Sequence, residues 1–207
     1  MARSKSSSRW LKEHFDDPYV KKAQQEGYRG RAAYKLLELQ AKYRLLKPGM
    51  IVVDLGAAPG SWSQVAHQFL GTKGRIIALD LLPMASLPGT LLLVGDFTSN
   101  EVYQELLAAL NDERIDVVLS DMAPNMSGIK SADQAAAMNL VEYARDFALT
   151  MLKPGGHFVT KAFQGSGFDA FSKDLRAHFT QVHFVKPDAS RDRSPEIYLV
   201  CLNKKEC

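Results

Sequence analysis

Two lysines and two carboxylates occupy positions in the sequence where they could form a catalytic site. Asp121 ends a predicted strand, Lys161 lies inside the next strand, and Glu196 begins the last one. Lys35, in the first turn of a predicted N-terminal helix, could reach the same edge of the sheet. A lysine in an apolar strand is costly unless it emerges beside a partner, and Asp121 is the expected partner. Together these groups could accept, donate or orient a proton at a reacting oxygen.

Each of these residues also has an ordinary structural interpretation. A strand lysine can protect a sheet edge from aggregation, and an acidic residue at a strand end is often a cap. A structural ion pair between Lys161 and Asp121 is a further alternative. Only the combination of two cations and two carboxylates near one mouth of the sheet favours catalysis.

A second group of residues surrounds a predicted strand-to-helix turn. Residues 51–53 are typical of a buried parallel strand, Asp54 follows them, and a helix is predicted from Trp62. Gly56 and Gly60 lie in the turn, where small residues let a ligand approach the backbone. The turn lacks the glycine spacing of a dinucleotide pyrophosphate site. Its acidic residue suits a positively charged ligand such as S-adenosylmethionine, although an ordinary turn without a ligand is an alternative.

Two more predicted strands end in a carboxylate. Asp80 ends the strand 75–80, where nucleotide-binding α/β folds use a carboxylate to hold a ribose diol. Asp96 follows the strand 91–94 and could accept a hydrogen bond from an adenine amino group, with Phe97 packing nearby. Because ligands of open α/β sheets bind at the carboxyl ends of strands, these residues predict one adenosine site.

Strands and helices alternate along the chain. The predicted strands are 51–53, 75–80, 91–94, 116–120, 157–163, 181–185 and 196–202; the predicted helices are 19–26, 32–43, 62–70, 101–110, 133–152 and 168–179. This order indicates an α/β protein with a Rossmann-like fold and helices on both faces of the sheet. The seven-stranded sheet should be mostly parallel, with one antiparallel strand because the last two strands are joined only by a loop.

Composition and charge narrow the class of protein. The chain of 207 residues is 46% hydrophobic, enough for a full core, yet it has no apolar run near the ~18 residues that span a membrane. The absence of a signal segment and the two cysteines favour a cytoplasmic protein, and no cluster has the spacing of a metal site.

The net charge of +3 is distributed unevenly. Residues 1–47 hold twelve Lys and Arg against five Asp and Glu, whereas residues 48–207 hold fourteen against eighteen. We therefore predict a basic N-terminal arm with helices at 1–47 that binds RNA, and a catalytic domain at 48–207. A merely solubilising tail is the alternative.

Four motifs carry a family resemblance: residues 54–60, 80–84, 120–128 and 193–196. They resemble the FtsJ/RrmJ family of heat-shock 2′-O-ribose methyltransferases of 23S ribosomal RNA, and the similarity runs from residue 8 to the last strand. The resemblance implies a Rossmann-like methyltransferase fold and S-adenosylmethionine as cofactor. It implies catalytic roles for Lys35, Asp121, Lys161 and Glu196. The cofactor contacts it implies are Gly60, Trp62, Asp80, Asp96 and Asp121, and Ser61 departs from an expected second glycine.

The expected reaction is in-line methyl transfer to a ribose 2′-hydroxyl, with uridine in the large (50S) subunit as the target that the resemblance favours. Lys161 would be the proton acceptor or a positioning charge, Lys35 a neighbouring cation, and Glu196 a residue that orients Lys35 or the ribose. We expect a monomer that binds no membrane. The alternatives are the same chemistry on tRNA or an mRNA cap, a non-catalytic RNA-binding protein, and a nicotinamide-dependent oxidoreductase.

Overall fold

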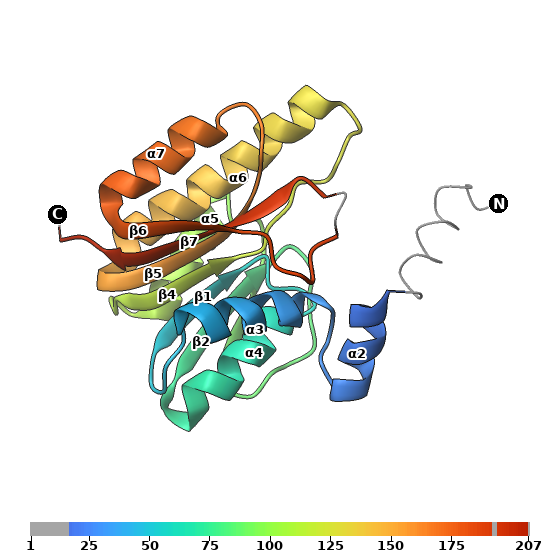
Figure 1. Cartoon of the computed structure of the whole chain (residues 1–207). Helices are drawn as coiled ribbons and strands as arrows, with labels where there is room; N and C mark the ends of the chain where they lie inside the picture. The colour runs from blue at the N-terminus through green and yellow to red at the C-terminus, as the bar shows by residue number, and fades with distance from the viewer. Residues whose placement is uncertain (1–16, 192–193, 207) are drawn as a thin grey trace.

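The sheet at the centre of the protein has seven strands in the order β3-β2-β1-β4-β5-β7-β6 (Figure 1). The computed structural model describes residues 17–191 and 194–206. The strands are β1 (Ile51–Leu55), β2 (Arg75–Asp80), β3 (Thr90–Val94), β4 (Ile115–Ser120), β5 (Leu152–Phe163), β6 (Phe179–Val185) and β7 (Glu196–Lys204). β7 runs antiparallel to both of its neighbours, β5 and β6, whereas the other strand pairs are parallel, which confirms the predicted mixed sheet.

Helices cover both faces of this sheet, as predicted (Figure 1). They are α2 (Pro18–Glu26), α3 (Ala32–Tyr43), α4 (Ser61–Leu70), α5 (Asn100–Leu110), α6 (Lys130–Met151) and α7 (Phe168–His178), with a short 3-10 turn, η1 (Gly71–Lys73). α2 begins where the sequence indicates. The Asp17 side chain caps the helix by accepting a hydrogen bond from the Tyr19 amide, and Pro18 lacks an N–H group at a position where the helix offers no acceptor for one.

Alternating strand residues build two separate cores. Val53 and Ile77 face the layer of α5, α6 and α7, whereas Val52 and Ile76 face α3 and α4. Leu36 of α3 is fully buried in the second core, and burying such a side chain contributes about 1.5–3 kcal/mol. Within the described residues, α3 is therefore part of the layer that covers the sheet, and the domain boundary at residue 47 stays a prediction.

Two element starts differ from the sequence prediction by three residues or more. α6 starts at Lys130, three residues before the expected start, and β5 starts at Leu152 instead of His157. Leu152 pairs with Ile115 and His157 with Val117, so residues 154–156, Pro-Gly-Gly, form an irregularity within the strand.

Two searches were confined to residues 17–191 and 194–206. Within them no helix is long and apolar enough to cross a membrane. No group of three or more His, Cys, Asp or Glu side chains is arranged to hold a metal ion there.

Candidate active site

The four predicted catalytic residues lie together at the carboxyl end of the sheet. Lys161 of β5 donates from Nζ to the Asp121 carbonyl oxygen at 2.7 Å and lies 3.1 Å from Asp121 Oδ1. Lys35 of α3 donates from Nζ to Glu196 Oε1 at 2.8 Å. Both lysines are only 8% exposed, so each ammonium depends on its carboxylate partner.

Tyr198 joins these two ion pairs, and sequence reasoning missed it. Its hydroxyl donates to Asp121 Oδ1 at 2.6 Å and accepts from Lys35 Nζ at 2.9 Å. The signal lay in the period of the strand: Tyr198 follows Glu196 by two residues and therefore shares its face of β7. It is also the cross-strand partner of Lys161, which only the register reveals.

The electrostatics keep this cluster in defined protonation states. Burial alone would raise the pKa of Glu196, but the adjacent Lys35 ammonium outweighs it and holds that pKa below its ordinary value. Burial and the charge of Asp121 raise the pKa of Tyr198 well above its ordinary value. Tyr198 is therefore a neutral donor that bridges two charged pairs near neutral pH.

Five of the residues predicted to bind the cofactor line one pocket of about 220 Å³. They are Gly56, Asp80, Asp96, Phe97 and Asp121. This pocket lies at the carboxyl ends of the central strands, where ligands of such sheets bind. Asp121 lines the pocket and also holds Lys161. It is therefore shared between the pocket and the four predicted catalytic residues, which we call the catalytic cluster after their predicted role: Lys35, Asp121, Lys161 and Glu196.

Backbone geometry shapes this pocket. Gly56 has φ +75°, and a Cβ there would lie 2.7 Å from the Met122 side chain, so only glycine fits. Asp80 accepts from the amides of Ala58 and Leu82 at 2.9 and 2.8 Å, which fixes its carboxylate between two loops. Hydrogen bonds from Thr98 lower the pKa of the exposed Asp96.

Three predicted cofactor residues do not line the pocket. Asp54 is fully buried and accepts from the Ser63 hydroxyl at 2.6 Å, because its side chain turns towards α4. Gly60 lies at the start of α4 with φ +102°, close to the Arg29 guanidinium. The Trp62 side chain is 2% exposed within the core and donates to the Ala32 carbonyl at 2.8 Å. Contacts of these residues with a cofactor remain predictions.

Ser61, the residue that departs from the expected glycine, faces the N-terminal helices. It is 2% exposed, and a Cβ on Gly30 would lie 3.0 Å from its hydroxyl oxygen. Its side chain is absent from the lining of the 220 Å³ pocket. Within the described structure, the serine therefore affects packing against the α2–α3 turn.

A second pocket, of about 660 Å³, opens over the Lys35–Glu196 ion pair. Arg31 and Arg191 lie on its wall, which gives this mouth a positive charge suited to a phosphate. Arg31 also bonds to Asp17 and to the Ala189 carbonyl, so the wall is held in place. Arg193, which belongs to one of the four motifs, lies outside the described residues, as do residues 1–16.

Comparison with known proteins matches this architecture. The family model described as FtsJ-like methyltransferase matches residues 28–204. The chain belongs to the FtsJ-like methyltransferase family. The matched range contains every strand of the sheet and all four residues of the catalytic cluster.

Close relatives of this FtsJ-like methyltransferase cover nearly its whole length. It is 59% identical over 200 residues to the ribosomal RNA large subunit methyltransferase E of Cellvibrio japonicus, covering 97% of this chain and 95% of the relative. It is 58% identical to the protein of that name from Pseudomonas aeruginosa, with 97% of each covered. A solved Plasmodium falciparum structure, assigned as a ribosomal RNA methyltransferase, superposes with a TM-score of 0.76 at 34% identity, covering 87% of this chain and 100% of that one.

Proposed function

We propose that this protein transfers the methyl group of S-adenosylmethionine to a ribose 2′-hydroxyl of large-subunit ribosomal RNA. The observation that carries the proposal is Asp121, which lines the 220 Å³ pocket and also holds Lys161. A methyl donor bound in this pocket would therefore lie beside the same carboxylate as the Lys161 amine. The names of the relatives, which describe ribosomal RNA methyltransferases, support the choice of substrate.

The residues of the 220 Å³ pocket fit S-adenosylmethionine. Gly56 has a backbone conformation that only glycine fits here, and the lack of a side chain lets a ligand approach the chain closely. Asp80 supplies an acceptor for ribose hydroxyls, and Asp96 supplies one for an amino group. Phe97 adds an apolar surface. When bound, S-adenosylmethionine supplies a methyl group that its sulfonium has already activated.

Lys161 would orient the ribose at this site. An ammonium has three donors; Lys161 uses one of them for the Asp121 carbonyl oxygen and forms an ion pair with the Asp121 carboxylate. A remaining donor can bond to the 2′-oxygen and hold it in line for transfer. In this arrangement Lys161 is a positioning charge, and it becomes a proton acceptor only after losing its own proton.

The RNA backbone would approach across the 660 Å³ pocket, where Arg31 and Arg191 offer positive charge beside Lys35. The exposed lysines of α2, Lys21 and Lys22, extend this basic surface. We further propose a uridine target in the 50S subunit, a monomeric enzyme and a cytoplasmic location. RNA binding by residues 1–47 belongs to the same proposal.

Methyl transfer by Lys161 variants tests this function. Transfer of tritiated methyl groups to unmethylated large subunits should fall by orders of magnitude in Lys161→Ala, while the melting temperature stays near that of the wild type. Lys161→Arg keeps the charge but cannot give up a proton near neutral pH. Near-normal turnover in Lys161→Arg would establish positioning, whereas its loss would support proton acceptance.

The same assay separates the alternative substrates. Mapping of the labelled nucleotide in subunits, tRNA and capped mRNA should place the methyl group in large-subunit RNA. Wild-type protein that binds RNA but transfers no methyl group to any of the three would refute the enzymatic proposal.

A further inference from the structure

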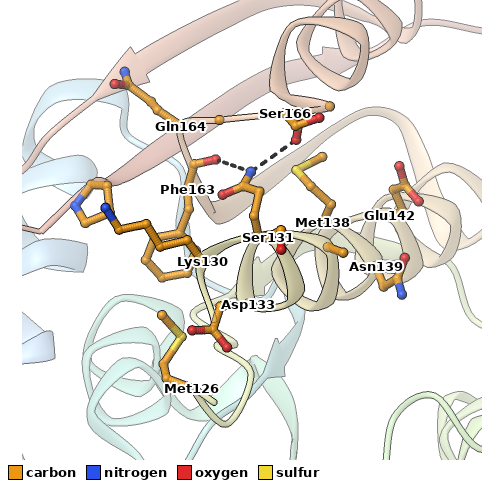
Figure 2. Close-up of a pocket in the computed structure, with 15 residues that line it drawn as sticks. Met126, Lys130, Ser131, Asp133, Met138, Asn139, Glu142, Phe163, Gln164 and Ser166 are labelled. Carbon is orange, nitrogen blue, oxygen red and sulfur yellow. Dashed lines mark hydrogen bonds between the residues drawn. The ribbon is translucent and has the colours of Figure 1, made fainter. Parts of the chain in front are cut away.

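A groove of about 750 Å³ lies beside the catalytic cluster, between the first half of α6 and the loop after β5 (Figure 2). Its near end adjoins the catalytic residues. Phe163 in its wall is the cross-strand neighbour of Glu196, and Pro195 directly precedes that carboxylate. Met126 lines both this groove and the pocket over Lys35. The groove therefore adjoins the proposed ribose site.

The side-chain amide of Gln134 is fixed in this wall. Its Nε2 donates to the carbonyl oxygens of Phe163 and Ser166, each at 3.2 Å, as the dashed lines in Figure 2 mark. These bonds use both amide hydrogens, and a flipped amide would place Oε1 against two carbonyl oxygens. The Gly165 backbone packs directly against this amide, because a Cβ on Gly165 would lie 2.7 Å from Gln134 Cδ. The groove therefore offers a fixed acceptor, Oε1.

The remaining walls suit a flat, partly apolar ligand with a charged end. Met126, 65% exposed, and Phe163 provide apolar surfaces beside the catalytic cluster. Figure 2 shows Lys130 near Phe163, with Asn139 and Glu142 at the opposite end of the groove. The Lys130 ammonium can bind a phosphate at the end of the groove beside the catalytic cluster. The Glu142 carboxylate would repel a phosphate at the opposite end. This charge order matches a nucleotide whose sugar-phosphate lies at the catalytic cluster.

We propose that this groove binds the base of the nucleotide whose ribose is methylated. The inference rests on the proposed function and adds the residues that select the base. Bases of single-stranded RNA are recognised by stacking and by hydrogen bonds along their Watson–Crick edges. Gln134 Oε1 accepts from the ring N–H that uracil and guanine carry and that cytosine and adenine lack.

Base preference tests the assignment directly. Ribosomal RNA fragments with uridine or cytidine at the methylated position serve as substrates for full-length wild type and Gln134→Leu. A lost hydrogen bond should reduce kcat/KM for the uridine substrate roughly fivefold to tenfold and remove the preference for uridine. The KM for S-adenosylmethionine should not change. Gln104→Leu, an exposed glutamine of α5, is the matched control and should behave like the wild type.

Met126→Ser is a second variant, chosen because Met126 is 65% exposed and its replacement removes little core packing. Its KM for the RNA should rise several-fold with kcat nearly unchanged. An active wild type whose uridine preference and RNA KM survive in both variants would overturn the groove assignment.

Photocrosslinking decides the question without methyl transfer. An RNA fragment with 4-thiouridine at the target position should crosslink to peptides containing Met126 or Phe163. Crosslinks confined to α2 and α3 would instead overturn the groove assignment. Because this readout needs no turnover, failure of the groove assignment is distinguishable from failure of the proposed function.

Discussion

Asp54→Asn should change how the stability of this protein depends on pH. Asp54 is fully buried, and its Oδ1 has no hydrogen-bond partner among the described residues. Burial, together with the charges of Asp121 and Asp80, raises the pKa of this carboxyl from 3.8 to about 7, although the Ser63 hydrogen bond opposes the shift. The folded protein therefore holds a proton on Asp54 that the unfolded chain releases above pH ~4.

The magnitude follows from the size of this shift. The stabilising contribution of the protonated carboxyl is complete below pH ~4 and is lost as the pH rises through about 7. A shift of about three units corresponds to about 4 kcal/mol in the free energy of unfolding. The side-chain amide introduced by Asp54→Asn does not titrate, so above pH ~7 the variant should melt on the order of 10 °C higher than the wild type.

Thermal unfolding of both proteins from about pH 5 to about pH 8.5, a range that spans the raised pKa, is the assay. The difference between the two curves isolates Asp54, because the two proteins share every other ionisable group. Ser63→Ala removes the hydrogen bond that lowers the folded-state pKa and leaves the unfolded-state pKa unchanged, so the loss of stability in this variant should continue to higher pH before it levels off. A difference between Asp54→Asn and wild type that is constant across this range would refute the reasoning, since Asp54 would then be ionised throughout.

Two further predictions concern the ligands. Asp80→Ala should weaken S-adenosylmethionine binding by about 1–3 kcal/mol in calorimetry and leave RNA affinity unchanged. If the variant binds S-adenosylmethionine as tightly as the wild type does, Asp80 is not part of the cofactor site. The double variant Lys21→Gln/Lys22→Gln should flatten the plot of log RNA affinity against log salt concentration. The slope of this plot changes by about 0.7 for each phosphate contact in single-stranded RNA. Arg29→Gln is the comparison, and a flattened slope in Arg29→Gln alone would contradict this assignment of the RNA-binding charges.

The sequence predicted the sheet and its strand-end carboxylates because both depend on local patterns. Apolar runs followed by an acidic residue place Asp80, Asp96 and Asp121 at one edge of any parallel sheet. Tyr198 was missed because its function arises from contacts with Lys35 and Asp121, on two other elements. A tyrosine in a strand is also typical of ordinary core packing. Only the pairing of β5 with β7 distinguishes the two roles.

The charges of the N-terminal segment show where reading by composition fails. Arg29 contributes to the net charge that predicts RNA binding, yet its guanidinium donates to the carbonyls of Pro59, Ala85 and Ser86 at 2.7–3.0 Å. These bonds tie the α2–α3 turn to the loop beside Gly56 and to the loop after β2. A count of charges therefore does not distinguish an arginine whose donors are held by carbonyl oxygens from an exposed lysine such as Lys21. Lys35 is also counted among the basic residues, yet α3 carries it into the catalytic cluster, where Glu196 and Tyr198 accept from its ammonium.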